Sequence, residues 1–422
     1  MGAMNAQAPG RGSELVTAGR AIGTGPQWLA SLWIGGINRV LDRIDAGLAR
    51  GAIEATLPDG STRVLGGREP GFVAIVHLRS ARALVRLATS GSVGWYQAWE
   101  AGEWDSPDPV PLFALFMDNG ASLGSVGRAS GPWRMAVRAL HWLHRNTRAG
   151  AERNIHAHYD LGNDFYAAWL GQTMAYSSAI FDGSEDAELD SAQRAKIARI
   201  AARAAVPPGG SVLEIGCGWG GQALALAGEG RRVDAISLSE EQLAFCREAL
   251  GGRDDVAFRK IDYRDIHGQY DAIVSVEMVE ALGREWWPAF MDCVARNLKP
   301  GGRAVLQYIT MREDLFEAYA RSADFIQTYV FPGGMLISES EFRALAEARG
   351  LEWTDAGTFG ADYAETLRLW RANFDAAVEE GRLPAGFDQR FVWLWRFYLM
   401  YCEGGFRGGG IDVAQVTLIK GG

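Results

Sequence analysis

The fold is decided by the stretch VLEIGCGWGG, which occupies residues 212–221. Its first four residues have the apolar character of a buried strand, and a helical segment follows the glycines at residues 222–227. Because glycines lack a Cβ, the backbone of such a turn can approach a ligand closely. A strand, a glycine-rich turn and a helix in this order predict a nucleotide-binding α/β sheet.

The details of this turn separate two classes of nucleotide-binding enzyme. Glu214 precedes the turn, the glycines have GxGxGG spacing, and no acid ends the second apolar segment, residues 233–236, to hold an adenosine ribose. The pattern resembles that of methyltransferases more than that of NAD enzymes. After the third segment, Asp262 could accept a hydrogen bond from an adenine amino group and Tyr263 could cover the purine; an ordinary loop pair is the alternative.

Apolar, strand-like segments alternate with helical patterns from residue 211 to residue 420. Such alternation predicts a parallel sheet that is covered by helices on both faces. The predicted strands are residues 212–215, 233–236, 256–259, 270–275, 304–307 and 413–418.

The chain before this region has a different organisation. Residues 1–25 are rich in glycine, alanine and polar side chains, which predicts a disordered tail. Residues 28–48 carry apolar side chains at helical spacing, and residues 52–57 and 72–78 alternate like short strands. We therefore expect four parts: a tail at 1–25, a small α+β domain at 26–120, a linker helix at 121–150 and a larger α/β domain at 151–422.

The linker region is strongly basic. Between residues 128 and 153 there are six arginines and one acid, Glu152, interleaved with tryptophan, leucine and other apolar residues. The arginines are Arg128, Arg134, Arg138, Arg145, Arg148 and Arg153. A basic amphipathic helix of this kind suits an anionic membrane surface; the alternative is a solvated linker helix whose apolar side packs on the next domain.

Composition and charge exclude several classes of function. The chain of 422 residues has a net charge of -9, whereas nucleic-acid binding needs a cationic face, so we expect no nucleic-acid partner. The four cysteines lie far apart without CxxC pairing, so we expect no metal site and no disulfide framework, and infer a reducing cytoplasm. No apolar run is long enough to span a bilayer.

A set of collinear motifs resembles one enzyme family. The segment HAHYDLGNDFY at 156–166 resembles the HYDxGNDFY signature of the cyclopropane-fatty-acid synthases and the related mycolic-acid methyltransferases. At the spacing of that family follow MAYSS at 174–178, SLSEEQ at 237–242, DYRD at 262–265, SVEMVE at 275–280, YVFPGG at 329–334 and FGADY at 359–363. The segments GSVGWYQAWE at 91–100 and GEWDSP at 102–107 resemble the phospholipid-type members in particular.

The resemblance implies a class I methyltransferase with a Rossmann-like sheet and S-adenosylmethionine as its cofactor. The implied methyl acceptor is the cis double bond of an unsaturated phospholipid acyl chain. The resemblance also implies a lipid-binding domain at 26–120, a homodimer, and a peripheral position at the cytoplasmic face of the inner membrane. The cofactor-binding residues carried over from the family are Tyr176, Ser177, Glu214, Gly216, Cys217, Gly218, Ser237, Gln242, Asp262 and Tyr263.

The reaction centre implied by the resemblance has two departures. Ring-forming members of the family hold a bicarbonate base with a Cys, a Glu, a His and a Tyr. This chain has Glu280 and Tyr363 at the matching positions, but Ser178 replaces the Cys and Gln307 replaces the His. Neither replacement can carry the positive charge of an imidazolium, which weakens the expectation of a bound bicarbonate. Glu280 is the residue we expect at the base site.

These departures favour a methyl- or methylene-branched open chain over a cyclopropane. Methyl transfer to an alkene leaves a carbocation that water would trap, so the site must be apolar and dry. Three alternatives stay open: a cyclopropane synthase in which the substitutions are neutral, a non-catalytic protein that binds lipid and cofactor, and a methyltransferase for a soluble amine or hydroxyl.

Overall fold

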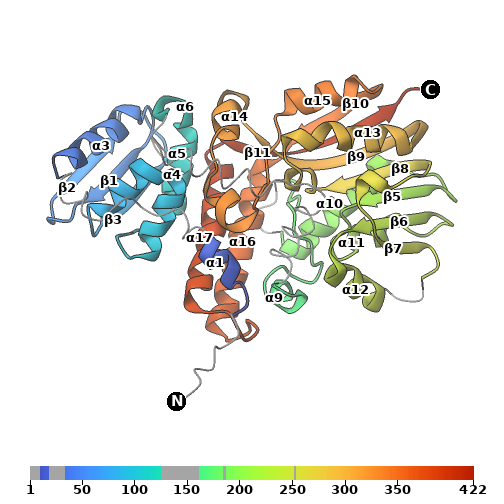
Figure 1. Cartoon of the computed structure of the whole chain (residues 1–422), viewed down its shortest axis with the longest axis horizontal. Helices are drawn as coiled ribbons and strands as arrows, with labels where there is room; N and C mark the ends of the chain where they lie inside the picture. The colour runs from blue at the N-terminus through green and yellow to red at the C-terminus, as the bar shows by residue number, and fades with distance from the viewer. Residues whose placement is uncertain (1–9, 19–33, 125–160, 184–186, 251–252) are drawn as a thin grey trace, which may run out of the picture.

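The computed structural model describes residues 10–18, 34–124, 161–183, 187–250 and 253–422. Figure 1 shows a small domain of residues 34–124 at one end and a larger α/β domain at the other, with two long helices, α16 (Gly360–Glu379) and α17 (Gln389–Arg407), between them. The predicted α/β class with a smaller N-terminal α+β domain is confirmed. The basic segment at 128–153 and the beginning of the motif at 156–166 lie outside the described residues.

The N-terminal domain is a four-stranded sheet with helices packed on it. In sheet order the strands are β2 (Thr62–Gly66), β1 (Ala52–Thr56), β3 (Val73–Leu78) and β4 (Trp104–Asp105). The helices are α3 (Ile34–Gly47), α4 (Arg82–Glu100), α5 (Val110–Asp118) and α6 (Gly120–Leu123). Alternate residues of β3 are buried, as expected of a strand with one face on the core. The two predicted strands are present, whereas β2 and the short β4 were not predicted.

The larger sheet has seven strands in the order β10-β11-β9-β8-β5-β6-β7. They are β5 (Ser211–Ile215), β6 (Arg232–Ser237), β7 (Val256–Lys260), β8 (Tyr270–Val276), β9 (Leu298–Met311), β10 (Leu351–Thr358) and β11 (Ile411–Lys420). All six predicted strands are present. The prediction of a parallel sheet is wrong for β11, which runs antiparallel to both β9 and β10. Two successive helices join β10 to β11, so the chain returns to the sheet in the reverse direction.

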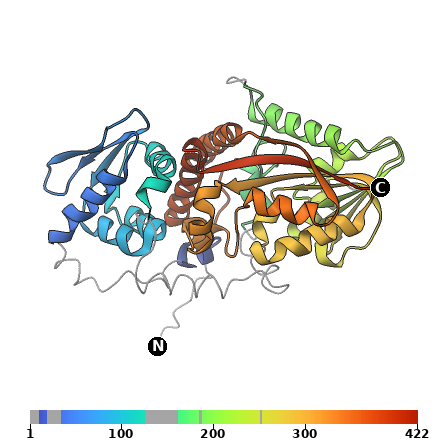
Figure 2. The ribbon, with the colours of Figure 1, turned by 90° about the horizontal axis from the view of Figure 1, so that it is seen from above.

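Helices cover both faces of this sheet, as predicted. Helix α10 (Leu189–Ala204) lies on one face, and α13 (Trp287–Asn297) and α15 (Glu339–Glu347) lie on the other (Figure 2). The remaining helical elements are α9 (Asn163–Ala167), α11 (Gly221–Leu226), α12 (Glu240–Ala249), α14 (Glu313–Ala320), the 3-10 turns η2 (Tyr263–Asp265), η3 (Val279–Ala281) and η4 (Arg284–Trp286), and the π-turn η5 (Ile326–Val330). None of the helices in the described ranges is both long and apolar enough to cross a membrane.

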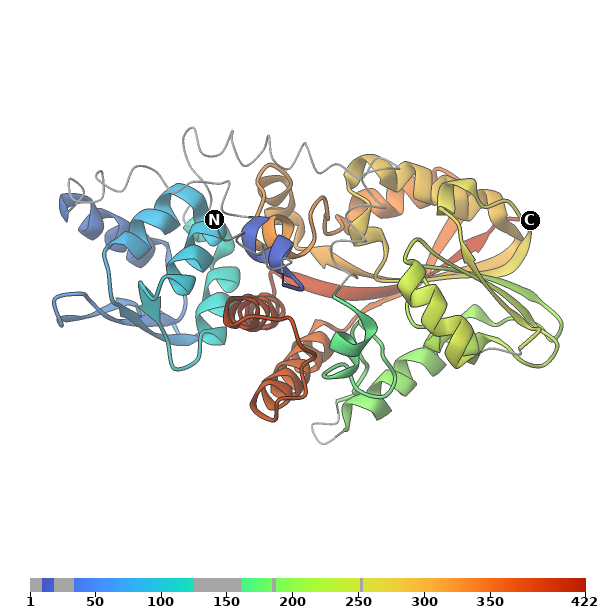
Figure 3. The ribbon, with the colours of Figure 1, turned by 60° about the horizontal axis from the view of Figure 1, so that its bottom comes forward.

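The two domains share one hydrophobic core. Helix α17 lies against α16 on one side and against α4 and α5 of the N-terminal domain on the other (Figure 3). At this junction the ring of Phe325 lies 5.0 Å from that of Tyr96 and 4.8 Å from that of Phe397, measured between centroids. Because aromatic side chains bury large apolar areas, these contacts stabilise the packing of the N-terminal domain on the larger domain.

The prediction of a disordered tail at 1–25 is wrong for residues 10–18. These residues contain the short helix α1 (Ser13–Ala18), in which Leu15 and Val16 are buried. Arg11 forms an ion pair with Asp164 of α9. Ordering this segment costs conformational entropy. The burial of two apolar side chains and the contact with a distant segment offset that cost.

Candidate active site

A cavity of about 350 Å³ lies where strands β5, β6 and β8 end. The crevice at the carboxyl ends of parallel strands is the usual ligand site of such a sheet. The cavity is lined by all ten predicted cofactor-binding residues: Tyr176, Ser177, Glu214, Gly216, Cys217, Gly218, Ser237, Gln242, Asp262 and Tyr263. The structure therefore brings the set together, and its role in binding a cofactor stays a prediction.

The glycine-rich turn keeps one side of the cavity open. Gly216 has a φ of 85°, in the left-handed region that glycine adopts freely. A Cβ at this position would lie 2.8 Å from the side chain of Met278, so a larger residue would displace the cavity wall. The N–H of Gly216 donates to the carbonyl of Ile236 at 2.9 Å, which ties the turn to β6.

Glu214 presents an unsatisfied acceptor to the cavity. It is buried near the end of β5, and its Oε2 has no hydrogen-bond partner within the part of the chain that the structure describes. Burial raises the pKa of this carboxyl well above its usual value, and the ammonium of Lys196 opposes that shift. A buried acceptor is costly unless a ligand supplies its donor. The hydroxyls of a ribose are such donors, so Glu214 fits the cofactor that the sequence implies.

The contacts of Asp262 differ from the sequence expectation. Its carboxylate accepts from the guanidinium of Arg264, with 2.8 Å between Nε and Oδ1, and Arg264 lies 4.7 Å from the ring centroid of Trp286. A carboxylate has further lone pairs, so Asp262 can still accept from an adenine amino group. Tyr263 is buried beside it, and no partner for its hydroxyl exists among the described residues.

The other half of the cavity is organised around Glu277, which sequence analysis did not single out. Its Oε1 accepts from the backbone N–H of Ser178 at 2.9 Å and from Nε2 of Gln307 at 2.7 Å. Its Oε2 accepts from the hydroxyl of Tyr363 at 2.6 Å. Three of the four predicted catalytic residues thus meet at one carboxylate, and the fourth, Glu280, lines the same cavity without joining this set of bonds.

The backbone of Glu277 is strained. Its φ is 48°, in the left-handed region that a residue with a Cβ rarely adopts. Residues held in such conformations cluster at functional sites. An acid directly after strand β8, at the edge where ligands bind, is the sequence feature that could have pointed to this residue.

Further hydrogen bonds orient the groups that donate to Glu277. Nε2 of Gln415 donates to Oε1 of Gln307 at 2.9 Å, which turns the other end of the Gln307 amide toward Glu277. The Ser178 hydroxyl donates to the carbonyl of Ala179 at 3.0 Å, so this residue serves Glu277 through its main chain. Ser178 and Gln307 are fully buried and do not line the cavity, whereas Glu277 and Tyr363 do.

Glu277 and Glu280 have unequal environments. Burial raises the pKa of Glu277, but its three donors and the charge of Lys196 oppose the rise. Burial and then the charge of Glu277 raise the pKa of Glu280 to about 8. Glu280 accepts one bond from the N–H of Ile309, and its Oε2 has no partner in the described structure. Two neighbouring carboxyls with such different surroundings divide their roles. The pKa of Glu280 favours its protonated form near neutral pH, whereas the three donors and Lys196 favour the ionised form of Glu277.

Lys196 links the two halves of the cavity. Its Nζ donates to Oγ of Ser177 at 2.6 Å, and its charge acts on both Glu214 and Glu277. Burial lowers the pKa of this lysine to about 8. Lys196 was not predicted, because the sequence around a buried lysine on an amphipathic helix does not distinguish it from a solvated lysine. Among the described residues no cluster of His, Cys, Asp and Glu is arranged to hold a metal ion.

Apolar and aromatic side chains form the rest of the wall. Phe331, Tyr398 and Phe406 line the cavity near Tyr363. Trp370 and Trp395, by contrast, are fully buried in the core. The polar and charged groups are therefore confined to a few points of a mostly apolar cavity, which is the pattern of a site for an apolar ligand.

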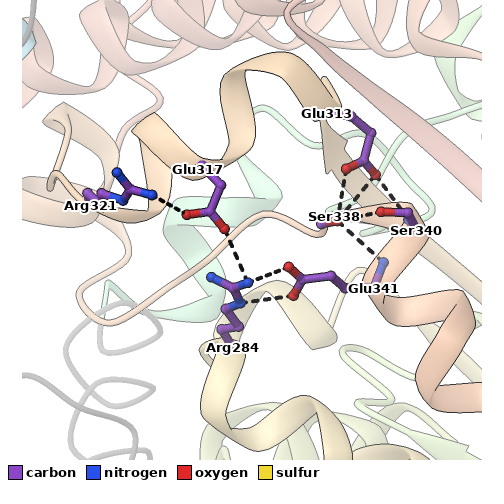
Figure 4. Close-up of polar contacts among 7 residues, drawn as sticks. All are labelled: Arg284, Glu313, Glu317, Arg321, Ser338, Ser340 and Glu341. Atoms are coloured by element: carbon purple, nitrogen blue, oxygen red, sulfur yellow. Dashed lines mark hydrogen bonds and ion pairs between the residues drawn. The ribbon is translucent and has the colours of Figure 1, made fainter.

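The wall segment that contains Phe331 is anchored by a polar network at both ends (Figure 4). Arg284 bonds to Glu341 of α15 at 2.9 Å and to Glu317 of α14 at 3.3 Å. The Ser338 hydroxyl, which caps α15, donates to Glu313 of α14 at 3.0 Å. Neighbouring helices thus hold the two ends of residues 321–338.

Comparisons of sequence identify the family. A family model described as mycolic acid cyclopropane synthetase matches residues 146–416. The tuberculostearic acid methyltransferase UfaA1 of Mycobacterium tuberculosis is 38% identical over 358 residues, which cover 80% of this chain and 81% of that protein. The cyclopropane-fatty-acyl-phospholipid synthase of Escherichia coli K12 is 32% identical over 353 residues, which cover 82% of this chain and 88% of that protein.

Solved structures agree. The cyclopropane synthase MmaA2 of Mycobacterium tuberculosis superposes with a TM-score of 0.59 at 28% identity, covering 64% of this chain and 98% of that one. The mycolic acid cyclopropane synthase CmaA1, solved with SAH and CTAB, gives a TM-score of 0.60 at 30% identity with the same coverage. The resemblance seen in the motifs is confirmed: the chain belongs to the mycolic acid cyclopropane synthetase family of S-adenosylmethionine-dependent methyltransferases that modify lipids.

Proposed function

We propose that this protein transfers a methyl group from S-adenosylmethionine to the cis double bond of an unsaturated phospholipid acyl chain and releases a branched, open-chain product. One observation carries the proposal. Tyr363, Gln307 and Ser178, which occupy the positions that hold bicarbonate in ring-forming family members, here hold the carboxylate of Glu277. The protein's own carboxylate takes the place of the external base.

The residues of the cofactor half fit S-adenosylmethionine. Its sulfonium supplies an electrophilic methyl group when the cofactor is bound. Glu214 has the free acceptor that ribose hydroxyls require, and the turn at Gly216 leaves room for close approach of the ligand. CmaA1, a solved relative, was crystallised with SAH.

The proposed reaction needs a base at a fixed point. One alkene carbon bonds to the methyl group, and the neighbouring carbon becomes a cation. A hydride shift between these two carbons moves the charge to the branched carbon. Glu277 then takes a proton from the new methyl group and leaves a methylene branch, or it takes one from the adjacent chain carbon and leaves a methyl-branched alkene. A saturated branch would need a hydride donor in a separate reaction.

The position of the base supports an open chain. A carboxylate attached to the backbone and held by three donors cannot follow the substrate as a free bicarbonate can. Proton loss that waits for a hydride shift gives a branch, whereas immediate proton loss from the methyl group gives a ring. The Mycobacterium tuberculosis relative at 38% identity is named for methyl transfer. The name of the Escherichia coli relative supports the ring as the competing product.

Membrane binding and assembly are part of the proposal. The Escherichia coli relative is named for a fatty-acyl-phospholipid, and the arginines between residues 128 and 153 suit an anionic surface. We place the protein at the cytoplasmic face of the inner membrane, as a homodimer. Replacement of Arg134, Arg138 and Arg145 by Ala should weaken binding to anionic vesicles and leave cofactor affinity intact. Unchanged vesicle binding would show that this segment is a linker and not a membrane-binding element. Analytical sedimentation of the wild-type protein would test the proposed dimer.

Product analysis tests the proposed reaction. The protein is incubated with S-adenosylmethionine and vesicles of cis-unsaturated phospholipid, and the acyl chains are released and examined by gas chromatography with mass spectrometry. A gain of one CH₂ unit that mild hydrogenation then saturates supports the branched product. A gain that resists hydrogenation would show a ring. No gain on lipid, together with methylation of a soluble amine or hydroxyl, would replace the proposal with the small-molecule reaction.

A further inference from the structure

A second cavity of about 170 Å³ lies between the two domains. The N-terminal domain contributes residues of α4 and α5, including Trp95 and Phe113, and the larger domain contributes α14, α17 and residues 322–324. This cavity contains none of the residues predicted to bind the cofactor or to act in catalysis. Nothing in the proposed reaction yet uses it.

The second cavity adjoins the active-site cavity. Five residues line both: Met117, Met311, Tyr319, Asp324 and Tyr401. Met117 belongs to α5, so the N-terminal domain reaches the wall of the active-site cavity itself. A chain that leaves the reaction half of the active site in this direction therefore passes from the larger domain into the junction between the domains.

The lining of the second cavity suits a hydrocarbon. Leucine, methionine and aromatic side chains make up most of its wall, together with small residues such as Gly91 and Ala323. Asp324 is the one charged residue among the described residues that line it, and none of these is a lysine or an arginine. A phosphate headgroup would meet a carboxylate and no cation there, which is unfavourable. The methyl end of an acyl chain carries no charge, so it needs no cation as a partner and is not repelled by a carboxylate.

The polar groups at the junction are already engaged. The carboxyl of Asp324 accepts from the N–H of Gln327 at 2.9 Å, and Tyr401 is a second donor. Ser92 of α4 accepts from the N–H of Phe325 at 3.0 Å. Burial raises the pKa of Asp324 to about 6. These bonds tie α4, the wall segment and α17 together, so the polar groups of the junction have partners within the protein.

Helix α4 is shaped around this cavity. Gly91, which lines it, interrupts the helix with a φ of 59° and a ψ of −139°. A residue with a Cβ would be strained in that conformation. The break occurs beside Ser90 and Ser92, which also line the cavity.

We infer that the cavity between the domains is the binding site for the methyl-terminal part of the acyl substrate, so that the N-terminal domain selects the length of chain beyond the double bond. The inference rests on the proposed function and deepens it. The reacting carbon is fixed beside Glu277, and the end of the second cavity limits how many carbons can follow it. The N-terminal domain then selects substrates by the length of the methyl-terminal part of the acyl chain, in addition to any contact it makes with the membrane.

Photolabelling tests this inference without turnover. The wild-type protein is mixed with vesicles of a cis-monounsaturated phospholipid whose acyl chain carries a diazirine at its methyl end, irradiated, and mapped by peptide mass spectrometry. Label in α4, α5 or residues 322–324 is expected. A second probe with the diazirine next to the double bond should label the active-site cavity. Label from the methyl-end probe that is confined to the active-site cavity or to the protein surface would overturn the inference.

A cavity-filling variant provides the matched kinetic test. Ala323→Phe should lower kcat/KM for a long-tailed substrate by about tenfold or more relative to a short-tailed substrate with the same double-bond position. Its control is Ala257→Phe on the exposed edge strand β7, where Ala257 lines neither cavity; this variant should not change kcat/KM for either substrate. An equal loss for both tails in Ala323→Phe, or no loss for either, would contradict the inference. If the wild type methylates no lipid at all, the proposed reaction fails, while the labelling result still decides what the cavity binds.

Discussion

The two halves of the active-site cavity are built in different ways. The cofactor half comes largely from residues at the ends of successive strands, so that a turn such as Gly216–Gly218 places its groups locally. The reaction half is assembled from four separate segments, which supply Ser178, Glu277, Gln307 and Tyr363. Local motifs therefore place the residues proposed to bind the cofactor, whereas tertiary packing places the three donors around the carboxylate proposed as the base. Substitutions in the two halves should have separable effects.

The largest effect is expected at the base. Glu277→Gln keeps the size of the side chain but removes the negative charge, so turnover should fall by about 10²–10⁴-fold. Cofactor affinity, measured by calorimetry, should change little. The matched control is Glu280→Gln, which mimics the protonated carboxyl that a pKa of about 8 predicts at neutral pH, and this variant should keep most activity. The reverse result, with Glu280→Gln inactive and Glu277→Gln active, would return the base to Glu280.

The next effect is expected at the hydroxyl that holds the base. Tyr363→Phe removes the donor 2.6 Å from Glu277, and hydrogen bonds to charged groups contribute about 1.5–3 kcal/mol, or roughly 10–100-fold in turnover. Tyr308→Phe is the matched control, because the Tyr308 hydroxyl is buried and has no partner within the described part of the chain. Equal rate losses in both variants would indicate a general packing effect.

A change in the cofactor half should leave the reaction half intact. Glu214→Leu removes the unsatisfied acceptor and should weaken S-adenosylmethionine binding by about 10–100-fold, since the proposed bonds from the ribose hydroxyls are lost. The melting temperature should not fall, because an unpaired buried carboxyl is removed. Turnover at saturating cofactor should change less than affinity does. Asp234→Asn, which alters an acid on β6 outside the cavity, is the control for affinity.

The smallest expected effect concerns pH. Lys196 is a cation below its pKa of about 8, and its charge lowers the pKa of Glu277, so it helps to keep the proposed base ionised as the pH falls. Lys196→Met should raise the pKa of Glu277, shift the acid limb of the pH–rate profile to higher pH and lower the rate at neutral pH. Glu280→Gln removes the other group whose pKa is about 8 and should leave the acid limb in place. An acid limb that is unchanged in Lys196→Met but shifts in Glu280→Gln would reverse the assignment.

The contrast between the two halves of the active-site cavity also explains which features the sequence could predict. The α/β class and the six apolar strands follow from periodicity and from one glycine-rich turn, whereas the residues that line the cofactor half were carried over from the family motifs. The reversed direction of β11 depends on the two-helix connection, which periodicity does not report. Ser178, Gln307 and Tyr363 were found through family positions, but their common partner was not. The side chain of Glu277 is directed at them by a left-handed backbone that no local pattern records.

The dependence of the rate on bicarbonate tests the central claim most directly. The transfer of labelled methyl groups to unsaturated acyl chains is measured for the wild type and for Glu277→Ala, in buffer stripped of carbon dioxide and with bicarbonate added. If Glu277 is the base, the wild-type rate is the same in both buffers, and Glu277→Ala is inactive in stripped buffer, with any recovery appearing only when bicarbonate is added. A wild-type rate that collapses in stripped buffer and returns with bicarbonate would contradict the account.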